Sequence, residues 1–547
     1  MESTHHERTN SAKNDHEEGL VSGRLPLINP GPSKSSKYEV TEVRANQIVP
    51  LEQYQKNGDA QDQAKESPSQ VKIQDSSDAK KAEPKKPVYA HRNKALNITR
   101  MLTLVLSNFY FGYFAMIGGV LSPALTELVY EIPEDDRNQV AGNFGFFLAV
   151  GCIFSSMLSG VLTRYIGRVK LIIVLEICRI ICCLIYRIED LNVFYSMRFA
   201  SGFLGGVGLG LVPLIVNEMI PTDLTGYGGS LSFTLITFGL FIGSLQSAFL
   251  GGKEGVEKHW QNALTWPIIL SVIVIALVLL TMFGIESPNY YYERYVEKEE
   301  VLKEKVLAYA KRFYTDEFAE KFTNDFIAEK KRIREASKGK AITFKSLFGP
   351  KYRKQFALGC GLNFLQQMTG INFLNFFAAQ LFDEISGNGA FMAIVLGAGQ
   401  FVGAATSVFV INSGRKPGML YPTIFLVLSL IILAVGVSYK IVILASIGMF
   451  LYVWSFCLGY ASIFSVWIVE ILPPVGSGLA FSTQWVTAAI IGLIGAPMLD
   501  LVGIEVIMVI FIIAGVLSCL VFWLFCHETI GKTEEEILNL YSGKKAK

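Results

Sequence analysis

The feature that most constrains this chain is a series of twelve apolar segments, each about 20 residues long, between residues 99 and 526. A helix of about 20 residues rises ~30 Å, which matches the hydrocarbon core of a bilayer. We therefore predict an all-α, polytopic membrane protein with twelve transmembrane helices. The predicted spans are, to within a few residues, 99–121, 140–162, 169–188, 192–217, 227–250, 264–285, 355–382, 389–411, 418–438, 441–470, 479–499 and 504–526.

The composition favours the same class of protein. Hydrophobic residues make up 51% of the 547 residues and charged residues 18%, against about 45–50% and about 25% in typical soluble domains. The formal net charge is +2, so charge gives no reason to expect a nucleic acid as a partner. The predicted partner of the apolar surface is the lipid bilayer.

The positions of the cysteines and histidines give no sign of metal binding or catalysis. All eight cysteines lie in apolar segments without metal-ligand spacing, and all six histidines lie outside those segments. We also find no catalytic nucleophile or phosphate-binding loop among the spans. The sequence therefore predicts no metal, no cofactor, no catalytic residues and no enzyme activity.

The charged residues divide the chain into five parts. Residues 1–95 are polar and predicted to form a disordered tail, which is either a docking segment for cytoplasmic partners or an extension without a role. Residues 96–285 and 355–526 each hold six spans. Residues 286–354 are predicted to form a cytoplasmic helical linker, and residues 527–547 a cytoplasmic C-terminal tail.

The distribution of basic residues predicts the orientation. The tail before the first span is rich in lysine and arginine, whereas the first loop beyond it, residues 131–136, is acidic. Residues 293–354 contain 17 Lys and Arg against 11 Asp and Glu. Because basic segments stay on the cytoplasmic side, we expect both termini to be cytoplasmic, in the plasma membrane.

Three short features recur in the same order in the two six-span halves. They are Gly167-Arg168 and Gly414-Arg415, Glu218-x-x-Pro221 and Glu470-x-x-Pro473, and Glu286-Ser-Pro288 and Glu528-Thr529. This order predicts a duplicated six-helix unit. Two parallel units of this kind form two pseudo-symmetric six-helix bundles, the major facilitator fold, with a substrate site between them near the middle of the membrane.

The segment Gln366-Gln-Met-Thr-Gly-Ile-Asn372 carries a more specific resemblance. Together with Arg198 and the features above, it resembles the sugar porter family of the major facilitator superfamily, which includes the facilitative glucose transporters, over about residues 98–537. The resemblance implies a membrane transporter that moves a hexose or related polyol by alternating access.

Amides in the seventh span suit such a substrate. Gln366, Gln367, Asn372 and Asn375 can each donate to and accept from sugar hydroxyls without placing a charge in the membrane. Gly370 allows the helix to bend or break among them. The alternative is that these amides hydrogen-bond neighbouring helices.

Further polar candidates for substrate binding are Gln400 in the eighth span and Gln484 with Trp485 in the eleventh. The resemblance implies a sugar-contacting amide at Gln484. It also implies a glutamine in the fifth span, where this chain has Phe233, and a tryptophan in the tenth, where it has Ser465.

Four charged residues are candidates for a cytoplasmic gate: Glu218, Glu470, Arg168 and Arg415. The resemblance implies an ion-pair lock that holds the outward-open state. Arginines that pair with the family's two glutamates are replaced here by Thr225 and Ser477, which predicts a sparser lock.

The first span lacks the acidic residue of proton-coupled sugar porters, because Phe114 occupies that position. We therefore expect facilitated diffusion, or uniport. Glu176 and Arg179 are charged residues within the third span, spaced to face each other on one helix, and we expect them to form a structural ion pair. The alternatives to a sugar uniporter are an organic ion carrier of the same superfamily and a non-transporting sugar sensor or scaffold.

Overall fold

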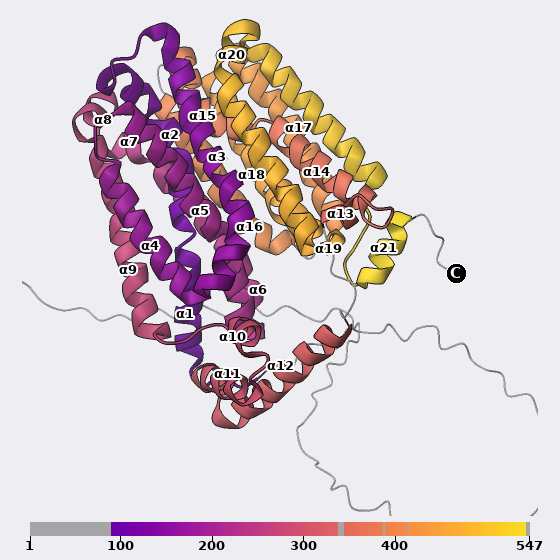
Figure 1. Ribbon diagram of the computed structural model, residues 1–547. Helices are drawn as coiled ribbons and strands as arrows, with labels where there is room; N and C mark the ends of the chain where they lie inside the picture. The colour runs from indigo at the N-terminus through magenta and orange to yellow at the C-terminus, as the bar shows by residue number, and fades with distance from the viewer. Residues whose placement is uncertain (1–88, 337–343, 387–388, 412, 543–547) are drawn as a thin grey trace, which may run out of the picture. The chain divides into compact units, whose positions relative to one another are not determined.

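The computed structural model describes residues 89–336, 344–386, 389–411 and 413–542. These parts are helical, and the described residues contain no strand beyond an isolated bridge between His91 and Tyr314 (Figure 1). The prediction of an all-α chain is confirmed.

The first half contains six spans. Its elements are α1 (Lys94–Leu106), α2 (Phe109–Ala124), η1 (Leu125–Val129), α3 (Glu134–Ile166), α4 (Arg168–Ile185), α5 (Leu191–Met219), α6 (Thr222–Ser244), α7 (Gln246–Phe249), α8 (Lys253–His259), η2 (Trp260–Leu264) and α9 (Thr265–Met282). The first span is α1 followed directly by α2, and α7, α8 and η2 form the connection before the sixth span, α9.

The second half repeats this pattern. Its elements are α14 (Arg353–Met368), α15 (Ile371–Ser386), α16 (Gly389–Val410), α17 (Arg415–Ser438), α18 (Val442–Phe456), η3 (Cys457–Ile463), α19 (Phe464–Ile471) and α20 (Pro474–Phe525). The 52 residues of α20 are two helices joined at Gly503, whose φ is 75°. The eleventh and twelfth predicted spans are therefore these two helices.

Nine segments of the described chain are long and apolar enough to cross a membrane, and one of them is the double helix α20. Two further predicted spans are helical in the structure. They are α4, which contains Glu176 and Arg179, and the pair α14–α15, which is broken at Thr369–Gly370. The charges in α4 and the break between α14 and α15 distinguish these two spans from an unbroken apolar helix.

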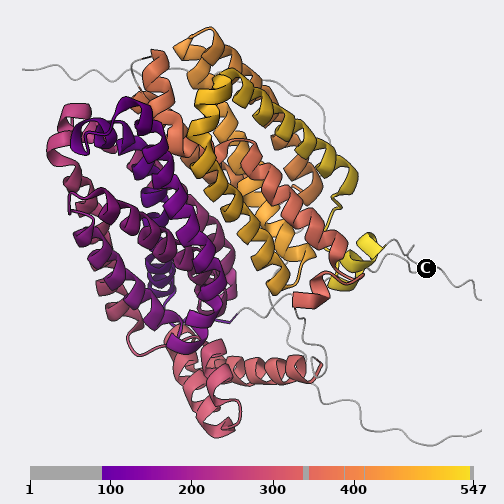
Figure 2. The same ribbon diagram turned by 45° about the horizontal axis from the view of Figure 1, so that its top comes forward.

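The remaining helices lie outside the two bundles. They are α10 (Pro288–Tyr295), α11 (Glu299–Phe313), α12 (Asp316–Ala336), α13 (Phe344–Leu347) and α21 (Glu534–Ser542). Figures 1 and 2 show α10–α12 at the end of the first half where α1 begins and α6 starts. We call this end of the bundles the linker side and the opposite end the far side.

The two halves meet on the far side. A Cβ atom at Gly119 would collide with the carbonyl oxygen of Asn375, and one at Gly142 with that of Gly492. Towards the linker side, a Cβ at Gly160 or Gly478 would meet no atom of the described chain within 4 Å. The structure is therefore closed on the far side and open between the halves on the linker side.

Glu176 and Arg179 form the predicted pair inside the first half. Arg179 Nη1 lies 2.6 Å from Glu176 Oε1, and both side chains are buried. Ser107 and Ser271 donate hydrogen bonds of 2.6 and 2.7 Å to the Glu176 carboxylate. Arg179 also donates to the carbonyl oxygens of Ser107 and Leu204. The carboxylate thus has a charged partner and two hydroxyl donors, the conditions under which a buried charge is tolerated.

The start of the described chain differs from the expectation of a disordered tail to residue 95. The ring of Tyr89 is buried among aromatic side chains that include Tyr314 and Phe322, and its hydroxyl donates to Asp325 at 2.8 Å. His91 Nε2 lies 2.9 Å from Asp223 at the start of α6. Residues 89–93 are therefore attached to α11, α12 and α6. Residues 1–88 lie outside the described chain.

Candidate substrate site

A cavity of about 470 Å³ lies between the two halves. This volume is within the range of small-molecule sites, about 300–1,000 Å³. The first half contributes residues of α2, α3, α5 and α6, and the second half contributes residues of α14, α15, α18, α19 and α20. The lining includes Ser159 and Gly478, which lie in the parts of α3 and α20 near the linker side.

Six of the seven predicted substrate-binding residues line this cavity. They are Gln366, Gln367, Asn372, Asn375, Gln484 and Trp485. These six residues lie up to 119 positions apart in the sequence, and they meet at the cavity because α14, α15 and α20 pack together. Trp485 meets the ring of Phe111 from the first half edge-on, with 5.6 Å between the ring centroids.

The side-chain amide of Gln366 makes a hydrogen bond through its nitrogen but not through its oxygen. Its Nε2 donates to the carbonyl oxygen of Tyr460 at 3.2 Å. Its Oε1 is buried and has no hydrogen-bond partner among the described residues. Leaving a buried acceptor without a donor costs about 1–3 kcal/mol. The atom is therefore suited to accept a hydrogen bond from a ligand that enters the cavity.

A break in the seventh span brings two other amides together. Gly370 has a φ of 97°, and a Cβ there would collide with the ring of Phe511. Because α14 ends at Met368 and α15 begins at Ile371, Asn372 Nδ2 can donate to Gln367 Oε1 at 2.6 Å. The predicted bend at Gly370 is confirmed. It joins amides that a straight helix would place on different faces.

Gln400 differs from the expectation because it does not line the cavity. Its Nε2 donates to Asn375 Oδ1 at 2.9 Å, and both residues are buried. Asn375 lies on the cavity wall and Gln400 lies behind it. Gln400 is thus placed to orient Asn375 rather than to touch a ligand.

Sequence reasoning missed the polar part of the first-half wall. Ser155, Ser156 and Ser159 of α3 line the cavity, next to Cys152. Ser156 Oγ also lies 3.0 Å from Ser482 Oγ of α20. The signal was the spacing of small polar residues along one face of the second span. That spacing alone does not tell a cavity-facing stripe from a helix-packing stripe.

The cavity wall carries no charged side chain among the residues that line it. Glu176 and Arg179 are absent from the wall, and they pair with each other inside the first half. Arg198 of α5 is also off the wall and buried, and it donates to the carbonyl oxygens of Phe144 and Phe114. The site can thus offer hydrogen bonds and apolar contacts, but no counter-ion.

The first predicted gate pair forms a cluster within the first half. Arg168 Nε lies 3.0 Å from Glu218, and its Nη2 lies 3.1 Å from Glu293 of α10. Glu286 accepts from the backbone N–H groups of residues 168–170 and so caps α4. Gly167, with a φ of 99°, makes this turn.

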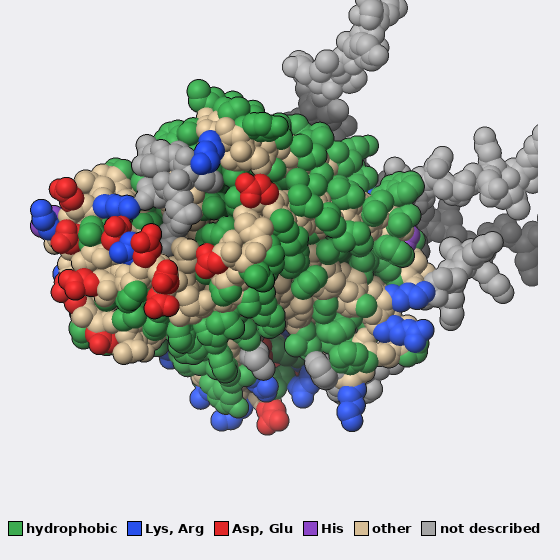
Figure 3. Space-filling model, turned by 90° about the horizontal axis from the view of Figure 1, so that it is seen from above, with side chains coloured by type: hydrophobic (Ala, Val, Ile, Leu, Met, Phe, Trp, Pro, Cys, Tyr) green, Lys and Arg blue, Asp and Glu red, His purple; other side chains and the backbone are tan. Residues whose placement is uncertain are grey.

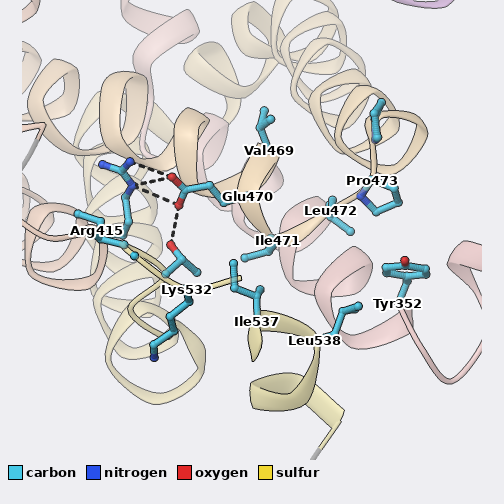
Figure 4. A pocket seen from close by; sticks show the side chains of 14 residues that line it. Tyr352, Arg415, Val469, Glu470, Ile471, Leu472, Pro473, Lys532, Ile537 and Leu538 are labelled. Carbon is cyan, nitrogen blue, oxygen red and sulfur yellow. Dashed lines mark hydrogen bonds and ion pairs between the residues drawn. The ribbon is translucent and has the colours of Figure 1, made fainter. Parts of the chain in front are cut away.

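The second gate pair forms an equivalent cluster within the second half. Arg415 Nη2 lies 2.8 Å from Glu470 Oε1, and both residues line a cavity of about 560 Å³ on the linker side. Figure 4 shows the two side chains pointing toward each other. Thr529 Oγ1 donates to Glu470 at 2.6 Å. Glu528 accepts from the backbone N–H groups of Arg415 and Lys416, so it caps α17 as Glu286 caps α4.

Burial alone would raise the pKa of Glu528. The backbone N–H groups of Arg415, Ile530, Lys416 and Thr529 outweigh that effect and hold the pKa below its usual value. The three repeated sequence features thus meet in two matching clusters. Each cluster ties together elements of its own half, and the described residues show no ion pair from one half to the other.

Residues 100–541 match the family described as Sugar (and other) transporter. This chain belongs to that family. Hexose transporter 1 of Plasmodium falciparum is 24% identical over 465 residues, which cover 79% of this chain and 90% of that protein. Facilitated glucose transporter member 2 of solute carrier family 2 from Mus musculus is 29% identical over 411 residues, 71% of this chain and 75% of that protein.

A solved structure supports the fold. The inward-open xylose transporter XylE from E. coli aligns with a TM-score of 0.65 and 19% identity, and the alignment covers 81% of this chain and 99% of that chain. The predicted major facilitator fold and the resemblance to sugar porters are confirmed. The protein is an integral, multi-pass membrane protein and a sugar transporter, and it has the major facilitator fold. Its relatives are transporters, in keeping with the expectation that it is not an enzyme.

Proposed function

We propose that this transporter moves a hexose or related polyol by facilitated diffusion, with the central cavity as its binding site. The observation that carries the proposal is the unpartnered Oε1 of Gln366, buried beside a cavity whose wall is rich in amides and free of charge. A sugar hydroxyl supplies the missing donor and accepts from a neighbouring amide N–H. The two relatives described above are named as hexose and glucose transporters.

The uncharged wall favours a neutral substrate over an organic ion. An ion that enters the cavity would lose its water and find no opposite charge on the lining residues, which is costly in a medium of low dielectric. The same wall favours uniport, because Glu176 lies off the cavity with its oxygens bonded to Ser107, Ser271 and Arg179. A coupled proton would need a carboxylate in contact with the transport path.

We propose that the linker side is cytoplasmic and that the protein resides in the plasma membrane. The far-side face of the first half carries acidic side chains (Figure 3), including Glu134, Asp135 and Asp136 in the first turn of α3. The linker side carries the basic residues of the two clusters and of α11 and α12. Basic segments are retained in the cytoplasm, so both termini belong there, together with any partner of the N-terminal tail.

We further propose that the two ion-pair clusters act as gate elements by keeping each half rigid. Arg168 links α4 to α5 and α10, and Arg415 links α17 to α19. Rigid halves that rock about the cavity are the usual basis of alternating access in this architecture. Residues 96–285 and 355–526 are the proposed moving units, with residues 286–354 as the cytoplasmic linker and residues 527–547 as a cytoplasmic tail.

The test is uptake by the purified full chain in liposomes. A panel of labelled hexoses, polyols, organic anions and organic cations is supplied outside. We expect uptake of at least one hexose or polyol, and competition by the unlabelled compound. Uptake of a charged compound alone would favour the ion carrier, whereas binding of a sugar without any transport would favour a sensor.

A further inference from the structure

We infer that the transported sugar presents two unlike faces to the cavity: free hydroxyls toward the second half, and an edge without free hydroxyls toward the first half. The inference rests on the function proposed above and specifies the substrate class of that site. The class is a deoxy or O-alkyl monosaccharide. It follows from the different chemistry of the two cavity walls.

The wall from the first half is apolar at the middle of the membrane. Phe111 of α2, Leu148 of α3 and Phe233 of α6 line the cavity, and each lies near the middle of its membrane span. Ile236 and Leu240 continue this surface along α6. None of these side chains donates or accepts a hydrogen bond.

The hydroxyls next to Phe233 do not compensate, because they are bonded within the first half. Ser232 Oγ accepts from Asn108 Nδ2 at 2.6 Å. Thr234 Oγ1 donates to the carbonyl oxygen of Ser230 at 3.0 Å. Neither residue lines the cavity. This wall is therefore less polar than it would be with the glutamine that the sugar porter family has at the position of Phe233.

The serines of α3 lie nearer the linker side. Ser155 and Ser156 follow Leu148 by about two helical turns, in the direction of the end of α3 at Ile166. Both donate to carbonyl oxygens of their own helix, at Cys152 and Ile153. Ser156 Oγ also lies 3.0 Å from Ser482 Oγ of α20. These serines, with Ser159, line the cavity toward the linker side, and the central part of this wall remains apolar.

The cavity wall from the second half is polar. Gln366, Gln367, Asn372 and Asn375 line it from α14 and α15, and Gln484 lines it from α20. Gln366 supplies a free acceptor. At the middle of the membrane, a sugar in the cavity can thus satisfy its hydroxyls toward the second half only. A hydroxyl on the other side would lose its water and gain no partner, which lowers affinity roughly five- to hundredfold.

The experiment is equilibrium binding to the purified full chain in detergent. The probes are D-glucose, D-galactose, their monodeoxy derivatives and their mono-O-methyl derivatives. We expect at least one derivative to bind about fivefold more tightly than its parent, or better, because removal of one unpaired hydroxyl relieves the penalty. If each parent binds more tightly than all of its derivatives, the inference is overturned and the proposed function stands. If no sugar of the panel binds, both fail.

Phe233 provides a second and independent readout. In Phe233→Gln the first-half wall gains a donor and an acceptor, so the ratio of derivative affinity to parent affinity should fall at least fivefold. Phe233→Leu keeps the wall apolar and should leave the ratio within about twofold of the parent protein. The ratio is measured within each folded variant, so a general loss of stability does not change it. An unchanged ratio in Phe233→Gln would contradict the assigned wall.

Discussion

At the scale of single residues, the amides of the seventh span differ in how far the protein itself satisfies them. Gln367 and Asn372 bond each other, and Asn375 is held by Gln400. Gln366 alone among these four keeps a buried atom without a partner in the described chain. The sequence could predict which amides lie near the site. It could not predict these pairings, because they depend on the break at Gly370.

Replacement of Gln366 by alanine should weaken sugar binding roughly two- to tenfold, the effect of one lost hydrogen bond of about 0.5–1.5 kcal/mol. The measurement is equilibrium binding of the best-bound sugar to purified protein. Asn363→Ala is the matched control, since Asn363 is a buried amide on the same helix that does not line the cavity. Equal affinities in all three proteins would remove Gln366 from the binding site.

The pair of Glu176 and Arg179 permits a prediction about stability. Removing one partner leaves a buried charge uncompensated, so Glu176→Leu or Arg179→Leu should cost about 3–5 kcal/mol. The double variant should lose less than the sum of the two single losses. Thermal unfolding in detergent gives the comparison. Additive losses would mean that the two side chains do not stabilise each other.

At the scale of elements, the helix boundaries were largely predictable because long apolar segments must cross the bilayer. The predicted span 192–217 is α5 at Leu191–Met219, and 418–438 is α17 at Arg415–Ser438. Less predictable were the attachment of residues 89–93 and the inward-facing serines of α3. A short polar segment has no periodicity to reveal its docking site, and the rotation of a helix about its axis is set by packing with its neighbours.

The repeated sequence motifs contain the glutamates that cap α4 and α17, but the sequence alone did not show that these glutamates act as caps. Glu528 ties residues 528–530 to the start of α17. The pKa of Glu528 in the folded protein lies below its usual value. The ionised carboxylate therefore stabilises the fold at every pH above that usual pKa. This stabilisation is lost as the pH falls through the folded-state pKa.

Glu528→Ala should therefore lower the Tm most at about pH 7, and the difference from the parent protein should shrink toward about pH 3. Thermal unfolding across this range measures the difference. Glu257→Ala serves as the control, since Glu257 is an exposed acid of α8. A Tm difference for Glu528→Ala that does not change with pH would show that its charge is not what stabilises the cap.

At the scale of the whole molecule, the two halves are closed on the far side, and the cavity between them opens to the linker side. Duplication explains why the same three features build both clusters, at Arg168 and at Arg415. The sequence predicted the fold, and the structure has a cavity between the halves, where the sequence predicted the substrate site. It did not predict which state of the transport cycle the structure shows, because both states use the same spans.

The N-terminal segment gives a prediction at this scale. Deletion of residues 1–80, which are rich in polar residues and predicted to be disordered, should leave transport unchanged. By contrast, Tyr89→Ala removes a buried aromatic ring from the surface of α11 and α12 and should cost roughly 3 kcal/mol of stability. Uptake and thermal unfolding of both proteins test this. Loss of transport in a folded 1–80 deletion would assign the tail a regulatory role.

In the mechanism that we propose, an uncharged, amide-lined cavity moves a neutral sugar down its gradient. The most direct test loads liposomes containing the purified protein with buffer, imposes an acid-outside pH gradient, and follows a labelled hexose to its final level. We expect equal sugar concentrations inside and outside, with or without the gradient, and slower uptake by Gln366→Ala. Accumulation above the external concentration that depends on the pH gradient would contradict facilitated diffusion and show proton coupling.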